Sequence, residues 1–108
     1  MNNNQYDIIP DELLKKGYSL EHLGILEYAW KKKEIEKILF ILKENKIAVL
    51  GGDVYRLNKN KVESTYDGWF LQKDGSSEFM ERSMEKVLTY INEYECRNGE
   101  NFLYVLVY

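Results

Sequence analysis

The last seven residues, FLYVLVY, constrain the fold most, because every one of them is apolar or aromatic. Successive side chains of a β-strand point to opposite faces, so a strand over residues 102–108 is apolar on both faces. Such a strand is usually central in a sheet or covered on both sides. The rest of the chain must therefore supply cover for both of its faces.

Apolar residues at helical spacing predict two main helices that supply this cover. The first is expected over about 34–44, after a break near Trp30, because the stripe that ends at Trp30 is out of phase with the one that follows. Phe40 and Ile41 make its later turns apolar nearly all round, which predicts a well-buried helix. The second is expected over about 78–94. A short helix is expected over 11–17, with Asp11 as its cap and Gly17 as a left-handed residue past its end.

Residues 47–57 and 62–71 have the composition of two strands joined by a turn at 58–61. Gly51 and Gly52 interrupt the first strand and predict a bend or β-bulge with positive φ. If Leu57 pairs with Val62, then Tyr55 lies opposite Ser64 and Asp53 lies opposite Tyr66. In that register Asp53 and Asp67 point to opposite faces of the hairpin.

Together these elements predict an α+β fold, in which a small, mainly antiparallel sheet packs against two main helices and short N-terminal helices. The length of 108 residues fits a single domain over 1–108, with residues 1–6 as a flexible tail. The polar N-terminus and short apolar runs indicate neither a secretory signal nor a membrane span, so a cytoplasmic location is expected.

Composition excludes several classes of site. One His and one Cys cannot form a disulfide framework or a zinc site with several His and Cys ligands, and no cofactor motif is present. The chain carries 18 acidic and 15 basic residues, with the basic excess confined to residues 31–46. This balance makes nucleic acid an unlikely partner. His22 and Cys96 lack the neighbours that would activate them, and structural roles are favoured for both.

One stretch resembles a known family. The segment IAVLGGDVY at 47–55, followed by YDGW at 66–69, is similar to the core signature of the immunity protein 40 family of bacterial polymorphic toxin systems. The resemblance covers roughly residues 20–95. It implies a non-enzymatic protein, without a cofactor, that binds the toxin encoded by a neighbouring gene. It would protect the producing cell by covering or distorting the toxin's active site.

Within this signature, Gly51, Gly52 and Trp69 are expected to be structural. Tyrosine is enriched in protein interfaces, and the hairpin carries the candidates for binding, which are Asp53, Tyr55, Tyr66 and Asp67. Two alternatives stay open. The chain could be a small hydrolase that uses Asp53 or Asp67, or a nucleic-acid-binding regulator that uses Trp30 and lysines 31–33.

Overall fold

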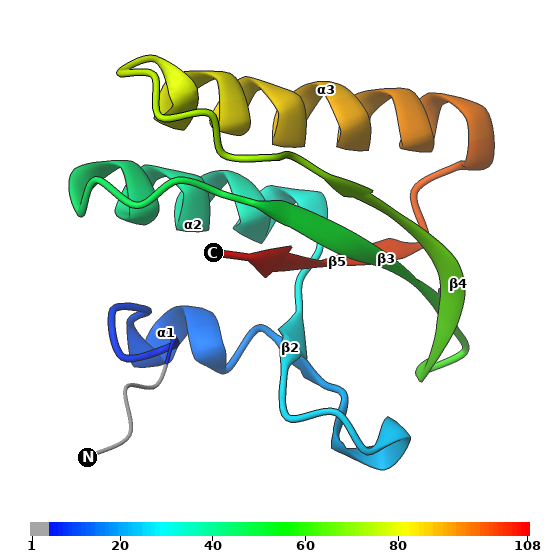
Figure 1. Cartoon of the computed structure of the whole chain (residues 1–108). Helices are drawn as coiled ribbons and strands as arrows, with labels where there is room; N and C mark the ends of the chain where they lie inside the picture. The colour runs from blue at the N-terminus through cyan, green and yellow to red at the C-terminus, as the bar shows by residue number, and fades with distance from the viewer. Residues whose placement is uncertain (1–4) are drawn as a thin grey trace.

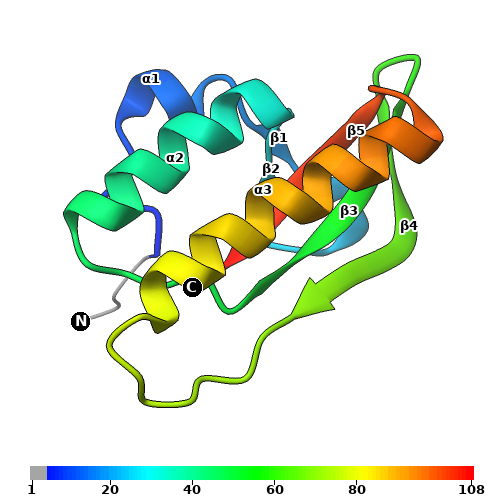
Figure 2. The ribbon, with the colours of Figure 1, turned by 90° about the horizontal axis from the view of Figure 1, so that it is seen from above.

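The computed structural model describes residues 5–108, and at its centre is a three-stranded antiparallel sheet. The middle strand is β3 (Gly51–Asn58), with β4 (Lys61–Phe70) on one edge and β5 (Phe102–Val107) on the other. Figures 1 and 2 show α2 (Lys32–Glu44) and α3 (Phe79–Asn98) side by side over one face of this sheet. The predicted α+β fold class is confirmed.

The N-terminal elements contribute residues to the cores on both sides of the sheet. They are α1 (Asp11–Leu14), β1 (Tyr18–Ser19), the 3-10 helix η1 (Glu21–Leu23) and β2 (Tyr28–Ala29). β1 and β2 pair with each other and lie across the sheet from the two long helices (Figure 1). Leu20 and Ala29 from this segment pack on the sheet residues of that face, which are Tyr55, Val62, Leu103 and Val105. Both faces of the sheet thus carry buried core residues, while in β4 only Val62 is buried.

β5 has the surroundings that its apolar sequence predicts. Residues 102–106 are all buried, alternately against the long helices and against the β1–β2 segment. The outer edge of β5 pairs with Trp30. The Trp30 amide donates to the Tyr104 carbonyl at 2.9 Å, and the Tyr104 amide donates to the Trp30 carbonyl at 2.8 Å. The prediction that this strand is covered on both sides is confirmed.

The N-terminal region departs from expectation in three places. Pro10, not Asp11, is the N-cap of α1, and no side chain caps the helix. Gly17 has no positive φ; a side chain there would instead meet the Trp30 indole at 3.0 Å, so packing explains the glycine. Of the expected tail, residues 1–4 lie outside the described residues. Tyr6 is buried, with its hydroxyl 3.0 Å from the Tyr28 amide that donates to it, so the tail prediction is wrong for Tyr6.

The two long helices lie close to their predicted bounds, and the break near Trp30 is confirmed, with Lys31 as the N-cap of α2. One expectation for α2 is wrong. Phe40 is 65% exposed, because the buried stripe of this helix, formed by Ile35, Ile38, Leu39 and Leu42, occupies one side only. The segment 47–50 is not a strand; the Val49 amide instead donates to the Ser83 hydroxyl at 3.0 Å.

Ser83 gives a prediction about stability. Its fully buried hydroxyl accepts from the Val49 amide and donates to the Met80 carbonyl at 2.7 Å, which ties the entry of β3 to α3. Ser83→Ala leaves the Val49 amide buried without a partner and is expected to lower the free energy of unfolding by about 2 kcal/mol. Thr89→Ala, on the exposed side of α3, is the control, with an expected change within about 0.5 kcal/mol in urea unfolding. Equal effects for the two variants would contradict the assigned role.

Buried phenols give a prediction about pH. Burial is the largest cause that raises the pKa of each of six tyrosines above the ordinary 10, to about 12 for Tyr108. The unfolded chain therefore loses phenol protons at lower pH than the folded chain, so stability is present below pH 10 and falls as pH rises toward 12. Circular dichroism should show alkaline unfolding together with a steep rise of phenolate absorbance. If the phenol groups titrate completely before the protein unfolds, the expected link between burial and alkaline unfolding is contradicted. The six are Tyr6, Tyr55, Tyr90, Tyr94, Tyr104 and Tyr108.

Candidate functional site

The signature hairpin is formed by β3 and β4, and the two consecutive glycines of β3 serve close packing. Gly52 pairs with Trp69 across the ladder, and a Cβ at Gly52 would overlap the Trp69 ring and approach the Val105 carbonyl oxygen to 2.6 Å. At Gly51, a Cβ would overlap the Trp69 carbonyl oxygen. Neither glycine has a positive φ and both lie in regular pairing, so the predicted bulge at this position is wrong. Only residues without a Cβ allow this approach.

Trp69 connects the hairpin to α3. Its ring lies over Gly52 on the helix side of the sheet and stacks against Tyr90 with ring centroids 4.6 Å apart. Tyr90 in turn stacks on Tyr94 at 5.9 Å. The Trp69 indole N–H is buried, and no acceptor within residues 5–108 reaches it. The GGD and YDGW segments therefore meet at one point, where β3, β4 and α3 pack together.

The irregularity in the hairpin lies in β4. Leu57 pairs with Val62 and Tyr55 with Ser64, as predicted. Asp53, however, pairs with Gly68 and not with Tyr66. Residues 65–67 therefore bulge out opposite Val54 alone, and the predicted register fails beyond Tyr55. At the apex of this bulge Tyr66 has φ +63° and is 95% exposed.

Asp53 and Asp67 point to opposite faces, as predicted. Asp67 accepts a hydrogen bond from the Tyr94 hydroxyl at 2.8 Å, which places it on the helix side of the sheet. Side chains alternate along β3, so Asp53 lies on the same face as Tyr55 and on the opposite face from Val54. The pKa of Tyr55 is raised chiefly by burial and further by Asp53 and Glu27, which agrees with this placement. A pair of catalytic carboxylates has to face one common space, and these two do not. The geometry therefore gives no support to the hydrolase alternative.

Two aromatic candidates are buried. Tyr55 is 6% exposed and belongs to the core under β1 and β2, so it supports the hairpin without reaching its surface. Trp30 is 2% exposed, and its indole N–H donates to the Leu13 carbonyl at 2.8 Å. The nucleic-acid alternative therefore loses its aromatic contact. Lysines 31–33 line a shallow depression together with Glu36, Glu95 and Glu100, which dilute their charge.

The single histidine and the single cysteine are not part of a group of metal-ligating side chains within the described residues. His22 lies with its Nε2 3.1 Å from the Val62 carbonyl oxygen, and Cys96 is exposed in the last turns of α3. Within residues 5–108 no three His, Cys, Asp or Glu side chains lie together as metal ligands do. No helix among these residues has the length and apolar character to cross a membrane.

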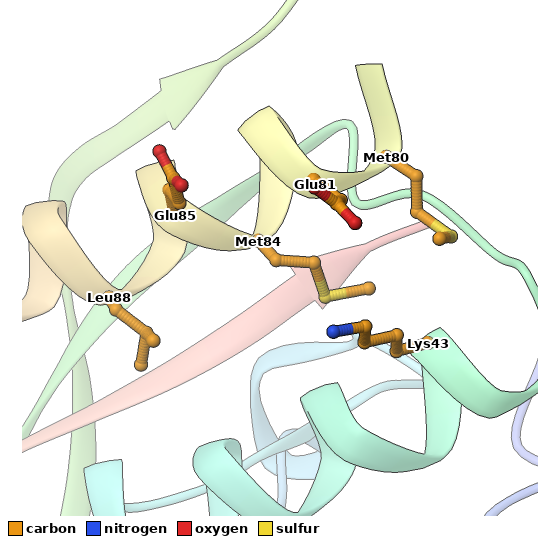
Figure 3. Close-up of a pocket in the computed structure, with 6 residues that line it drawn as sticks. All are labelled: Lys43, Met80, Glu81, Met84, Glu85 and Leu88. Carbon is orange, nitrogen blue, oxygen red and sulfur yellow. The ribbon is translucent and has the colours of Figure 1, made fainter. Parts of the chain in front are cut away.

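A groove between α2 and α3 was not predicted from the sequence. Figure 3 shows Lys43 of α2 reaching toward Met84 of α3, with Glu81 and Glu85 projecting from the α3 side. The exposed ring of Phe40 lines its continuation along α2. The signal lay in Phe40 itself, whose position off the main stripe of α2 leaves it outside the core. The groove is lined by Lys43, Met80, Glu81, Met84, Glu85 and Leu88.

Comparison with known families places the chain among the immunity proteins. The match is to the family model described as Immunity protein 40 and extends over residues 19–108, well over half of the chain. The chain belongs to the Immunity protein 40 family. The match runs beyond the expected 20–95 and includes β5, the strand that pairs with the signature hairpin. No curated protein and no solved structure matches the chain.

Proposed function

We propose that the chain binds a cognate toxin domain, encoded by a neighbouring gene, and neutralises it in the cytoplasm of the producing cell. The family match over residues 19–108 is the observation that carries this proposal. Neutralisation is by stoichiometric binding that covers or distorts the toxin's active site, without turnover. The divergence of Asp53 and Asp67 supports a binding role over a catalytic one.

The proposed binding surface is the exposed part of the signature hairpin. Tyr66 projects from β4, and the exposed carboxylates Asp53 and Asp67 lie on either face of the sheet next to the bulge. The chain as a whole carries 18 acidic against 15 basic residues, and such an excess attracts a basic partner and speeds its association at low salt. A toxin domain with a basic surface, such as one that cleaves nucleic acid, fits this charge.

Co-expression tests the proposal. The toxin domain encoded next to the gene is expressed in a bacterial host with this chain or with an empty vector, and survival is measured. The expected result is growth only with the chain present, together with co-purification of the two proteins. Chain variant Gly52→Val, which is expected to misfold, serves as the control that loses protection. A neighbouring product that is harmless alone, or one that kills equally in both strains, would refute the proposal.

A further inference from the structure

Tyr66 combines two features that rarely occur together. It is 95% exposed, the highest value among the exposed large apolar and aromatic side chains of the described residues. Its φ of +63° lies in the left-handed region, which for a bulky residue is an outlier. Strained residues of this kind persist only where the surrounding structure holds them, and they cluster at functional sites.

The neighbouring residues hold the bulge in place. The Ser64 hydroxyl accepts from the Tyr66 amide at 3.1 Å. The Thr65 hydroxyl donates to the Val54 carbonyl at 2.8 Å and accepts from the Asp67 amide at 3.1 Å. The Tyr94 hydroxyl, on α3, donates to Asp67 at 2.8 Å. The backbone that carries Tyr66 is therefore fixed on both sides, to β3 and to α3.

The fold explains the bulge but does not explain the tyrosine. A bulge in an edge strand protects it from pairing with another chain, and β4 is an edge strand. Glycine or asparagine at the apex would serve this purpose with less strain, since both adopt positive φ readily. An almost fully exposed ring also adds nothing to the core. The ring at this position is accounted for by contact with something outside the chain.

We propose that Tyr66 is the anchor residue of the toxin interface and inserts its ring into a pocket on the toxin. This inference rests on the proposed function and deepens it. Tyrosine is enriched among residues that dominate interface energies, and a pre-fixed backbone lowers the entropy lost on binding. Asp53 and Asp67 flank the bulge from opposite faces, so the complementary pocket carries basic side chains at its rim.

Binding measurements with single variants test the inference. The probe is the toxin domain from the neighbouring gene, inactivated by mutation, and its dissociation constant is measured by calorimetry with the folded full chain. Tyr66→Gly is expected to weaken binding by about 100-fold or more, which is the effect of losing a dominant anchor. Its melting temperature is expected to stay equal or rise, because glycine relieves the strain at φ +63°. Tyr66→Asn, which also tolerates this φ, is expected to lose binding to the same extent.

The matched control is Phe40→Ala, which removes an exposed aromatic ring on α2, away from the hairpin. It is expected to change the dissociation constant by no more than about threefold from the wild-type value, as is usual for a substitution outside an interface. If the wild-type chain binds the toxin domain and Tyr66→Gly binds it with the same affinity, the inference is overturned and the proposed function still stands. A fall in melting temperature for both Tyr66 variants would also overturn it, because the ring would then serve the fold. Failure of the wild-type chain to bind would refute the proposed function itself.

Discussion

Gly52→Ala is expected to lower the free energy of unfolding by about 3 kcal/mol, the upper part of the range for overpacking a rigid core. The added Cβ would overlap the Trp69 ring and lie 2.6 Å from the Val105 carbonyl oxygen. The ring has little room to move because it stacks on Tyr90, and the carbonyl belongs to the backbone of the neighbouring strand. The measurement is chemical unfolding followed by circular dichroism.

The control for this variant is Gly75→Ala, in the loop before α3. Gly75 has φ +76° and open space around it. Alanine there is expected to lower the free energy of unfolding by about 1–2 kcal/mol, because only its backbone conformation is unfavourable. A comparison of the two separates the cost of steric overlap from the cost of losing a glycine. A smaller effect at Gly52 than at Gly75 would contradict the packing described for the GGD and YDGW segments.

Trp30→Ala is expected to lower the free energy of unfolding by about 3–5 kcal/mol. The ring is buried between Tyr6, Tyr28 and Gly17, and its indole N–H satisfies the Leu13 carbonyl. Its loss creates a cavity and removes the contact that ties α1 to the sheet. Thermal unfolding and hydrogen exchange of α1 amides should both show the change.

Leu26→Ala provides the matched comparison for Trp30. Leu26 is 86% exposed and is expected to change stability by no more than about 0.5 kcal/mol. The nucleic-acid alternative requires the opposite pattern, in which an accessible Trp30 is dispensable for folding. A Trp30→Ala protein as stable as the wild type would contradict the burial described above.

The sequence predicts most of the elements because periodicity reports burial directly. The stripes over 34–44 and 78–94 locate α2 and α3, since each helix buries one face. The strand over 102–108 is recognised from apolar character on both faces, which only a doubly covered strand requires. The predicted cap at Asp11 fails because α1 begins one residue earlier, with Pro10 as its N-cap. The predicted left-handed residue at Gly17 fails because a tertiary contact decides there: this glycine admits the Trp30 ring.

The hairpin shows where prediction from sequence stops. Alternation fixes the pairs nearest the turn, where Lys59 and Asn60 adopt the positive φ of a tight two-residue turn. The bulge at 65–67 escapes prediction, because tyrosine is a poor residue for the left-handed conformation at its apex. The sequence feature that indicates this bulge is Ser64-Thr65. The side chains of both residues form hydrogen bonds with nearby backbone groups and so compete with regular strand pairing.

The candidate site was predictable only in part for the same reason. The motif identifies the hairpin, but whether an aromatic on a strand faces the core or solvent depends on layers contributed by distant segments. Tyr55 is buried because β1 and β2 cover its face, whereas Tyr66 is exposed because the bulge lifts it from the sheet. The residue types alone do not distinguish them.

Titration of toxin activity tests whether the chain neutralises the toxin by stoichiometric binding. A fixed concentration of the toxin domain, well above the dissociation constant, is mixed with increasing amounts of the folded chain, and residual toxin activity is measured. The predicted result is a linear fall that reaches its end point at one chain per toxin domain and does not deepen with time. Complete loss of activity at a small fraction of that ratio, growing with incubation, would show turnover and rule out stoichiometric neutralisation. Activity that persists at excess chain would rule it out as well.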